Sequence, residues 1–171
     1  VVLVLQQVAV GDVGVEQLLS RCVERTGAVV VANGRGAAEI GREVADKAGR
    51  IVIVAGSMGP TGEIMEPMGP LSFDGAVEMF HEQAEALKDG GADVLWVETI
   101  SSPDEYKAAA RAAELAEMPW VGTMSFDTAG RTMMGVTSTD FAALVAGLSH
   151  RPLAYGANCG VGSSDLLRTV L

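Results

Sequence analysis

The sequence predicts a parallel α/β fold, because short apolar runs alternate along the chain with longer amphipathic stretches. Five runs are rich in Val, Ile or aromatic residues, and each is bounded by Gly, Pro or a polar residue, as in parallel strands buried on both faces. These runs are 28–32, 51–55, 94–97, 120–124 and 153–157. Patterns of helical period separate them, and this order implies right-handed crossovers within one sheet.

Length and charge limit the class of protein. The 171 residues predict a single domain over 1–171, although a complete eight-stranded α/β barrel has about 250 residues. The chain carries 22 acidic and 12 basic residues, a net charge of −10, which disfavours binding to nucleic acid or to an anionic membrane. Its two cysteines, Cys22 and Cys159, have neither disulfide-framework nor metal-type spacing, which indicates a reducing, cytoplasmic location.

Two helices have clear sequence signals. The first has apolar residues at three- and four-residue steps and ends at Gly90 and Gly91. Its apolar positions are Phe73, Ala76, Val77, Phe80, Ala84 and Leu87. The second begins with Ser102 as N-cap and Pro103 at the first helical position, and Glu105 is expected to complete a capping box. Further helices are predicted over 139–148 and from Ser163 onward.

Chemistry is expected at the mouth of the sheet, where the carboxyl ends of the strands meet. An eight-stranded barrel and an open sheet both satisfy the pattern, and both place their functional groups there. Four strand ends offer polar or reactive side chains. They are the turn 56–62, Glu98 with Thr99, the segment 125–127, and Asn158 with Cys159.

Cys159 is the strongest candidate among these residues for a metal ligand or a nucleophile. It lies in the glycine-rich turn 156–162, directly after an apolar run, where a thiolate could hold a metal or attack an electrophile. The alternative is a small apolar side chain that fills a tight turn. Glu98 has two interpretations as well, a carboxylate that faces the mouth or one that only caps the next segment. The turn 56–62 resembles a phosphate loop only loosely, since it lacks the lysine and the spacing.

Four motifs in order resemble those of the homocysteine S-methyltransferase family, and most closely its bacterial betaine–homocysteine methyltransferase-like branch. They are VAGSMGPTG at 54–62, GADVLWVET at 91–99, FD with GRTMMGV over 126–136, and GANCG at 156–160. The resemblance covers 37–171 well, whereas 1–36 match poorly. Together the four motifs are far more specific than any one of them.

The resemblance implies a (βα)₈ TIM barrel that is incomplete in this chain, with strands three to six and an irregular N-terminal unit. It also implies zinc at the mouth and transfer of a methyl group to the thiol of homocysteine, which gives methionine. The donor must be activated, as in betaine or a sulfonium compound. Zinc bound by thiolates favours the thiolate form of the incoming thiol near neutral pH, so the family needs no general base.

Residue by residue, the resemblance makes Cys159 a zinc ligand and Glu98 the acceptor of the homocysteine amino group. Five further residues are expected to line the mouth as substrate-binding groups: Ser57, Thr123, Ser125, Phe126 and Asn158. The other cysteine ligands of zinc are expected beyond Leu171. One cysteine does not make a zinc site, so the chain on its own is expected to be inactive.

Unpaired strand edges and uncovered apolar sheet would favour association, so a homo-oligomer is predicted. A second hypothesis is a non-catalytic binding or scaffold protein, derived from the same barrel but without metal. A third is an enzyme with Cys159 as covalent nucleophile, which would need His81 or His150 nearby.

Overall fold

The computed structural model describes residues 29–32, 34–127, 129–160 and 162–170, which form one sheet of five parallel strands. The strands are β1 (Val29–Ala32), β2 (Ile53–Met58), β3 (Val94–Ile100), β4 (Trp120–Met124) and β5 (Ala154–Ala157). They pair in chain order, β1 to β5. A doubly wound sheet reverses its order at a switch point, whereas a (βα)₈ barrel does not. The predicted α/β fold of TIM-barrel type is therefore confirmed.

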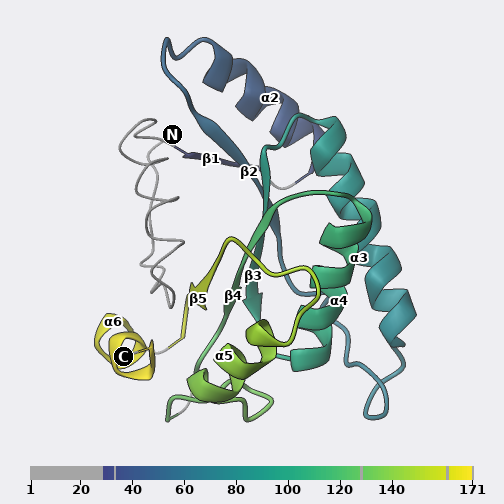
Figure 1. Cartoon of the computed structure of the whole chain (residues 1–171), viewed down its shortest axis with the longest axis vertical. Coiled ribbons are helices and arrows are strands. Elements are labelled where there is room, and N and C mark those ends of the chain that lie inside the picture. The colour runs from purple at the N-terminus through teal and green to yellow at the C-terminus, as the bar shows by residue number, and fades with distance from the viewer. Residues whose placement is uncertain (1–28, 33, 128, 161, 171) are drawn as a thin grey trace.

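Each strand is followed by a helix. The helices are α2 (Arg35–Asp46), α3 (Phe73–Asp89), α4 (Pro103–Leu115), α5 (Ser138–Ala146) and α6 (Ser163–Val170). Figure 1 shows α3 and α4 side by side along one side of the strands. None of the described helices combines the length and the apolar character needed to cross a membrane.

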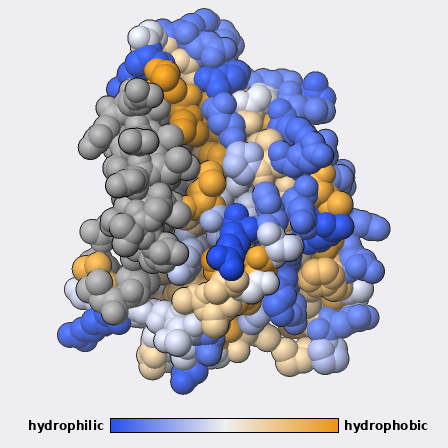
Figure 2. Space-filling model, viewed as in Figure 1, coloured by the Kyte–Doolittle hydropathy of each residue, from blue (hydrophilic) through white to orange (hydrophobic). Residues whose placement is uncertain are grey.

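The core lies between these helices and the sheet. Tyr106 of α4, Trp120 of β4 and Leu87 of α3 are fully buried, and the alanine-rich face of α4 lets the helices approach closely. A Cβ on Gly122 would lie 2.3 Å from the Tyr106 hydroxyl, so the ring packs directly on the β4 backbone. Burial raises the pKa of Tyr106, which keeps the phenol neutral. Figure 2 shows hydrophilic residues over most of the helical side and a hydrophobic strip along the strands.

Two strands run further toward the mouth than predicted. β2 ends at Met58, not at residue 55, because Gly56 to Met58 pair with residues 95 to 97 of β3. β3 continues to Ile100 through a bulge: Glu98 and Thr99 together oppose only Thr123 of β4. Bulges re-aim side chains and occur frequently beside functional sites. Here the bulge carries one of the predicted site residues.

The helix boundaries follow most of the predicted signals. α3 ends at Gly90 and Gly91, and Gly91 adopts a φ of 90°, as expected of a glycine after a helix end. α4 begins with Ser102 as N-cap and Pro103 in its first turn, as predicted. The predicted capping box was wrong, because the Glu105 carboxylate bonds to Thr61 of the β2–α3 loop rather than returning to Ser102.

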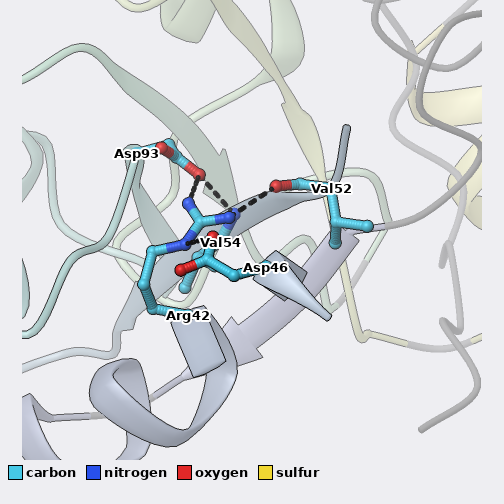
Figure 3. Close-up of polar contacts among 5 residues, drawn as sticks. All are labelled: Arg42, Asp46, Val52, Val54 and Asp93. Atoms are coloured by element: carbon cyan, nitrogen blue, oxygen red, sulfur yellow. Dashed lines mark hydrogen bonds and ion pairs between the residues drawn. The ribbon is translucent and has the colours of Figure 1, made fainter. Parts of the chain in front are cut away.

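The opposite end of the sheet from the mouth is fastened by Arg42 and Asp93 (Figure 3). The Asp93 carboxylate lies 2.9 Å from Arg42 Nη1 and accepts the backbone N–H of Val54 at 2.7 Å. Arg42 also donates to the carbonyl of Val52 and to Asp46. One aspartate therefore joins α2, the first half of β2 and the start of β3.

Replacing Asp93 by Ala is expected to lower the free energy of unfolding by about 2 kcal/mol, because the buried Val54 N–H loses its acceptor. Arg42→Ala should cost about 1 kcal/mol, since its ion pairs are partly exposed. The control Asp46→Ala, at a side chain 67% exposed, should change stability by less than about 0.5 kcal/mol. Urea denaturation measures all three, and equal losses for Asp93 and Asp46 would contradict the account.

The C-terminus of α4 ends in a left-handed residue that is not glycine. Glu117 has a φ of 53°, and the N–H groups of Glu117 and Met118 bond back to the carbonyls of Glu114 and Ala113. This is the Schellman pattern, which usually carries glycine at that position. Lys88 of α3 donates to the carbonyl of Ala116 at 2.6 Å, so the helix end is also held from its neighbour.

Glu117→Gly is expected to raise the free energy of unfolding by about 0.5–1 kcal/mol. A non-glycine residue in the left-handed region costs about 1–2 kcal/mol, and the greater chain entropy of glycine offsets part of the gain. Glu117→Ala keeps the unfavourable backbone and should leave stability nearly unchanged. Thermal or urea denaturation of the two variants tests these expectations. A Glu117→Gly variant less stable than the unaltered protein would count against the prediction.

Candidate functional site

The first element of the site is a carboxylate held at the mouth. Glu98 lies in the β3 bulge and is half-buried. The Ser57 hydroxyl, near the end of β2, donates to Glu98 Oε1 at 2.6 Å. This hydrogen bond fixes one carboxylate oxygen and leaves Glu98 Oε2 facing the neighbouring strand ends. Sequence alone predicted both residues but not their contact.

Asn158, just past the end of β5, is the hub of the site. Its side-chain oxygen accepts the backbone N–H of Thr99 at 3.0 Å and the Thr123 hydroxyl at 2.7 Å. Its Nδ2 donates to Thr99 Oγ1 at 2.7 Å, and it lies 3.4 Å from Glu98 Oε2 and 3.3 Å from Cys159 Sγ. One amide therefore joins the ends of β3, β4 and β5.

Cys159 projects from this hub toward solvent. It is exposed, which excludes the interpretation of a buried apolar side chain. Its φ is 58°, and the following Gly160 has a φ of 79°. A Cβ on Gly160 would lie 2.3 Å from the carbonyl oxygen of Phe126, so the turn needs glycine there. Because Asn158 Nδ2 contacts both Glu98 and Cys159, the acid and the thiol lie side by side on one rim.

The other predicted residues lie at or just after the end of β4, but their side chains are buried and contact other protein groups. The Thr123 hydroxyl donates a hydrogen bond to the side-chain oxygen of Asn158. Ser125 is buried, and its hydroxyl lies 3.5 Å from Asp127 Oδ1. Phe126 is 2% exposed, and its ring centroid lies 6.3 Å from that of Phe141. The sequence placed these residues at the end of a strand, as the structure has them, but it did not reveal which side chains turn into the core; their part in substrate binding stays a prediction.

The sequence places Thr99 at a strand end but indicates no role for it. Its Oγ1 accepts from Asn158 and lies 3.9 Å from Cys159 Sγ. Its φ is 63°, in a region that β-branched residues rarely occupy. The bulge that produces this conformation depends on the register of β3 against β4. No local sequence signal reveals that register.

A second polar contact, also missed, holds the β2–α3 loop beside the site. Glu105 is 5% exposed, and its Oε1 accepts both the N–H and the hydroxyl of Thr61, at 2.7 and 2.6 Å. The loop, the start of α4 and the pair Met133 and Met134 line a cleft of about 370 Å³. The two methionines are exposed, as residues near a mouth would be, whereas Met58 and Met124 belong to the core.

The described residues supply only part of a metal site. Among them no group of three His, Cys, Asp or Glu side chains is arranged to hold an ion. Cys159 offers one exposed thiol sulfur, which suits zinc as one ligand of a set. A complete site therefore needs ligands from outside the described part of the chain.

Gly160→Ala is expected to lower the free energy of unfolding by about 2 kcal/mol or more, because the new methyl overlaps the Phe126 carbonyl and the backbone is left-handed. Gly36→Ala is the matched control, since nothing lies within 4 Å of that position in α2 and Ala stabilises helices by up to about 1 kcal/mol. Urea denaturation should therefore show shifts of opposite sign. A tolerated Gly160→Ala would mean that the Cys159 turn is built differently.

Comparison with known proteins places the chain in a family. A sequence profile described as homocysteine S-methyltransferase matches residues 23–171. The apo crystal structure of the homocysteine methyltransferase MmuM from Escherichia coli is 26% identical, with a TM-score of 0.61, over 77% of this chain and 49% of that one. Its metallated form is 27% identical, with a TM-score of 0.54, over 77% and 47%. This chain thus spans about half the length of those proteins, and it belongs to the homocysteine S-methyltransferase family.

Proposed function

We propose that this chain forms part of the substrate site of an enzyme that transfers a methyl group to the thiol of homocysteine, giving methionine. The observation that carries the proposal is the pairing of Glu98 with Cys159 through one amide, Asn158 Nδ2. A carboxylate and a thiol on one rim suit a small amino acid with a cationic group at one end and sulfur at the other. The family assignment supports the same reaction class.

Glu98 is proposed to receive the homocysteine ammonium group. A charge-assisted hydrogen bond between ammonium and carboxylate is about twice as strong as a neutral one. Because Ser57 holds Oε1, the carboxylate presents a defined direction to the ligand. Binding the amino end at a fixed point limits where the thiol can lie, and such orientation contributes to the rate of a two-reactant step.

Cys159 is proposed to supply one thiolate ligand to zinc, with the remaining ligands outside the described residues. The metallated MmuM structure supports a metal-binding family. Zinc held by thiolates acts as a Lewis acid and makes the thiolate form of a bound thiol available near neutral pH. On the described chain, the contributions are the exposed sulfur of Cys159 and the glycine-rich turn that presents it.

The methyl donor is proposed to be betaine-like or a sulfonium compound. In the reaction the homocysteine sulfur forms a bond to the methyl carbon while the carbon–nitrogen or carbon–sulfur bond of the donor breaks. The bonding electrons leave with the donor, which becomes a neutral amine or thioether. No proton moves in this step, so Glu98 has only to bind and orient. A net charge of −10 favours the approach of cationic groups.

The covalent-nucleophile hypothesis has less support. His81 lies 3.8 Å from Glu85 of its own helix, and His150 Nε2 lies 3.1 Å from the carbonyl of Met118. Met118 precedes β4, at the end of the sheet opposite Cys159. Neither contact places a base beside the thiol, which an activated cysteine needs.

A scaffold protein without metal remains the second candidate, because the described residues hold a single thiol ligand. A homo-oligomer and a cytoplasmic location are also proposed. Among the described strands, β1 and β5 each pair with one neighbour only, and unpaired strand edges favour association.

Glu98→Gln is expected to weaken homocysteine binding about ten- to hundredfold, because a charged hydrogen bond worth about 1.5–3 kcal/mol is lost. Calorimetric titration of the protein with its remaining zinc ligands present, and zinc supplied, measures the change.

Cys159→Ser should lower bound zinc, measured by atomic absorption, and leave the unfolding midpoint nearly unchanged. The control Glu78→Gln, on the exposed face of α3, should match the unaltered chain. Absence of bound zinc in the unaltered protein with all of its ligands present would favour the scaffold, whereas zinc and homocysteine binding that survive both site changes would contradict the proposed roles of Cys159 and Glu98.

A further inference from the structure

Two residues that face each other at the site hold left-handed backbone conformations without being glycine. Thr99 has a φ of 63° and Cys159 a φ of 58°, and Thr99 Oγ1 lies 3.9 Å from Cys159 Sγ. Such conformations persist only when surrounding structure holds them, and they cluster at functional sites. Threonine is the less favourable of the two because its Cβ is branched.

Asn158 provides the contacts that hold Thr99. Its Oδ1 accepts the Thr99 N–H at 3.0 Å, while its Nδ2 donates to Thr99 Oγ1 at 2.7 Å. A backbone N–H can only donate, so the orientation of the amide follows from the first bond. The Thr123 hydroxyl, across the bulge, donates to the same oxygen. Asn158 is 7% exposed, so these bonds form in a site largely shielded from water.

We infer that Asn158 and Thr99 form a clamp that sets the position of Glu98 relative to Cys159, and that Asn158 is a positioning residue rather than a direct ligand of substrate. This inference rests on the proposed function. The clamp consists of the two reciprocal bonds between Asn158 and Thr99. The Asn158 oxygen and nitrogen both already have protein partners, which leaves little capacity for substrate.

The bulge explains why Glu98 depends on the clamp. Glu98 and Thr99 are the two residues opposite Thr123, and pairing with β4 resumes at Ile100. If Thr99 relaxed to a negative φ, the peptide between Glu98 and Thr99 would rotate, and the position of the Glu98 carboxylate relative to Cys159 would change. The strands on either side would keep their register. The clamp therefore acts on the geometry of the site more than on the sheet.

The first test measures the clamp itself. In Asn158→Ala the Thr99 N–H loses its acceptor, so its hydrogen exchange, followed by NMR, should become at least tenfold faster. Thr132→Val is the matched control, because the Thr132 hydroxyl is buried and accepts the N–H of Val136 away from the clamp. It should leave exchange at Thr99 unchanged.

The second test measures positioning with two ligands, L-homocysteine and L-2-aminobutyrate, which lacks only the thiol. Glu98 can bind the amino group of either, but only homocysteine gains from a correct distance to the sulfur site. Asn158→Ala should therefore lower the ratio of the two affinities at least tenfold, in titrations with zinc supplied. Asn158→Ala/Thr99→Gly guards against misfolding: glycine adopts the left-handed backbone freely, so the denaturation midpoint should recover while the ratio stays low.

The outcomes separate the two proposals. Unchanged exchange at Thr99 in Asn158→Ala would overturn the clamp. Faster exchange with an unchanged affinity ratio would overturn the positioning role and leave homocysteine binding intact as the proposed function. If the unaltered protein, with its remaining zinc ligands present, fails to bind homocysteine, the proposed function is refuted, and the positioning role with it. Faster exchange together with a lower ratio, and neither effect in Thr132→Val, supports both.

Discussion

The site depends on one buried amide. The Asn158 oxygen accepts bonds from the β3 bulge and from β4, and its nitrogen donates to Thr99 and lies within reach of Glu98 and Cys159. Strand ends are where a parallel sheet stops making ladder hydrogen bonds, so the bulged Thr99 N–H needs a side-chain acceptor. The same amide that satisfies this backbone group brings the carboxylate and the thiol together. The hydrogen bond that the Thr99 N–H needs and the relative position of Glu98 and Cys159 therefore depend on the same side chain.

Stability and chemistry are divided between the two ends of the sheet. At the amino ends of the strands, Asp93 and Arg42 join α2, β2 and β3 through an ion pair and backbone bonds. At the carboxyl ends lie the half-buried Glu98, the exposed Cys159 and non-glycine residues in left-handed conformations. The unfavourable backbone at Thr99 and Cys159 is tolerated because the core between α3, α4 and the strands holds the sheet. The left-handed residue at the amino ends, Glu117, is held separately by the end of α4 and its contact with Lys88. This division is general in α/β barrels.

Sequence reasoning recovered what local chemistry determines. The order of elements, the limits of β4, the Gly91 helix end and the Ser102–Pro103 helix start follow from patterns within a few residues. It also located Glu98, Asn158 and Cys159 at strand ends. It missed what register determines: the bulge at Glu98 and Thr99, and the contact of Glu105 with Thr61, 44 positions away. Such contacts join residues far apart in the chain, and no sequence pattern near either residue predicts them.

The Glu105 case shows how a correct local signal can lead to a wrong contact. Ser102 and Glu105 have the spacing of a capping box, and the N-cap half of it forms, with the Glu105 N–H 3.4 Å from Ser102 Oγ. The carboxylate had two possible uses, to cap its own helix or to bond the N–H and hydroxyl of Thr61. The second use satisfies two donors of a loop that has no helix or strand of its own to satisfy them, and a buried carboxylate gains more from two donors than from one. Tertiary context therefore determined the partner, and the loop it fixes is the one that follows Ser57 and borders the rim of Glu98 and Cys159.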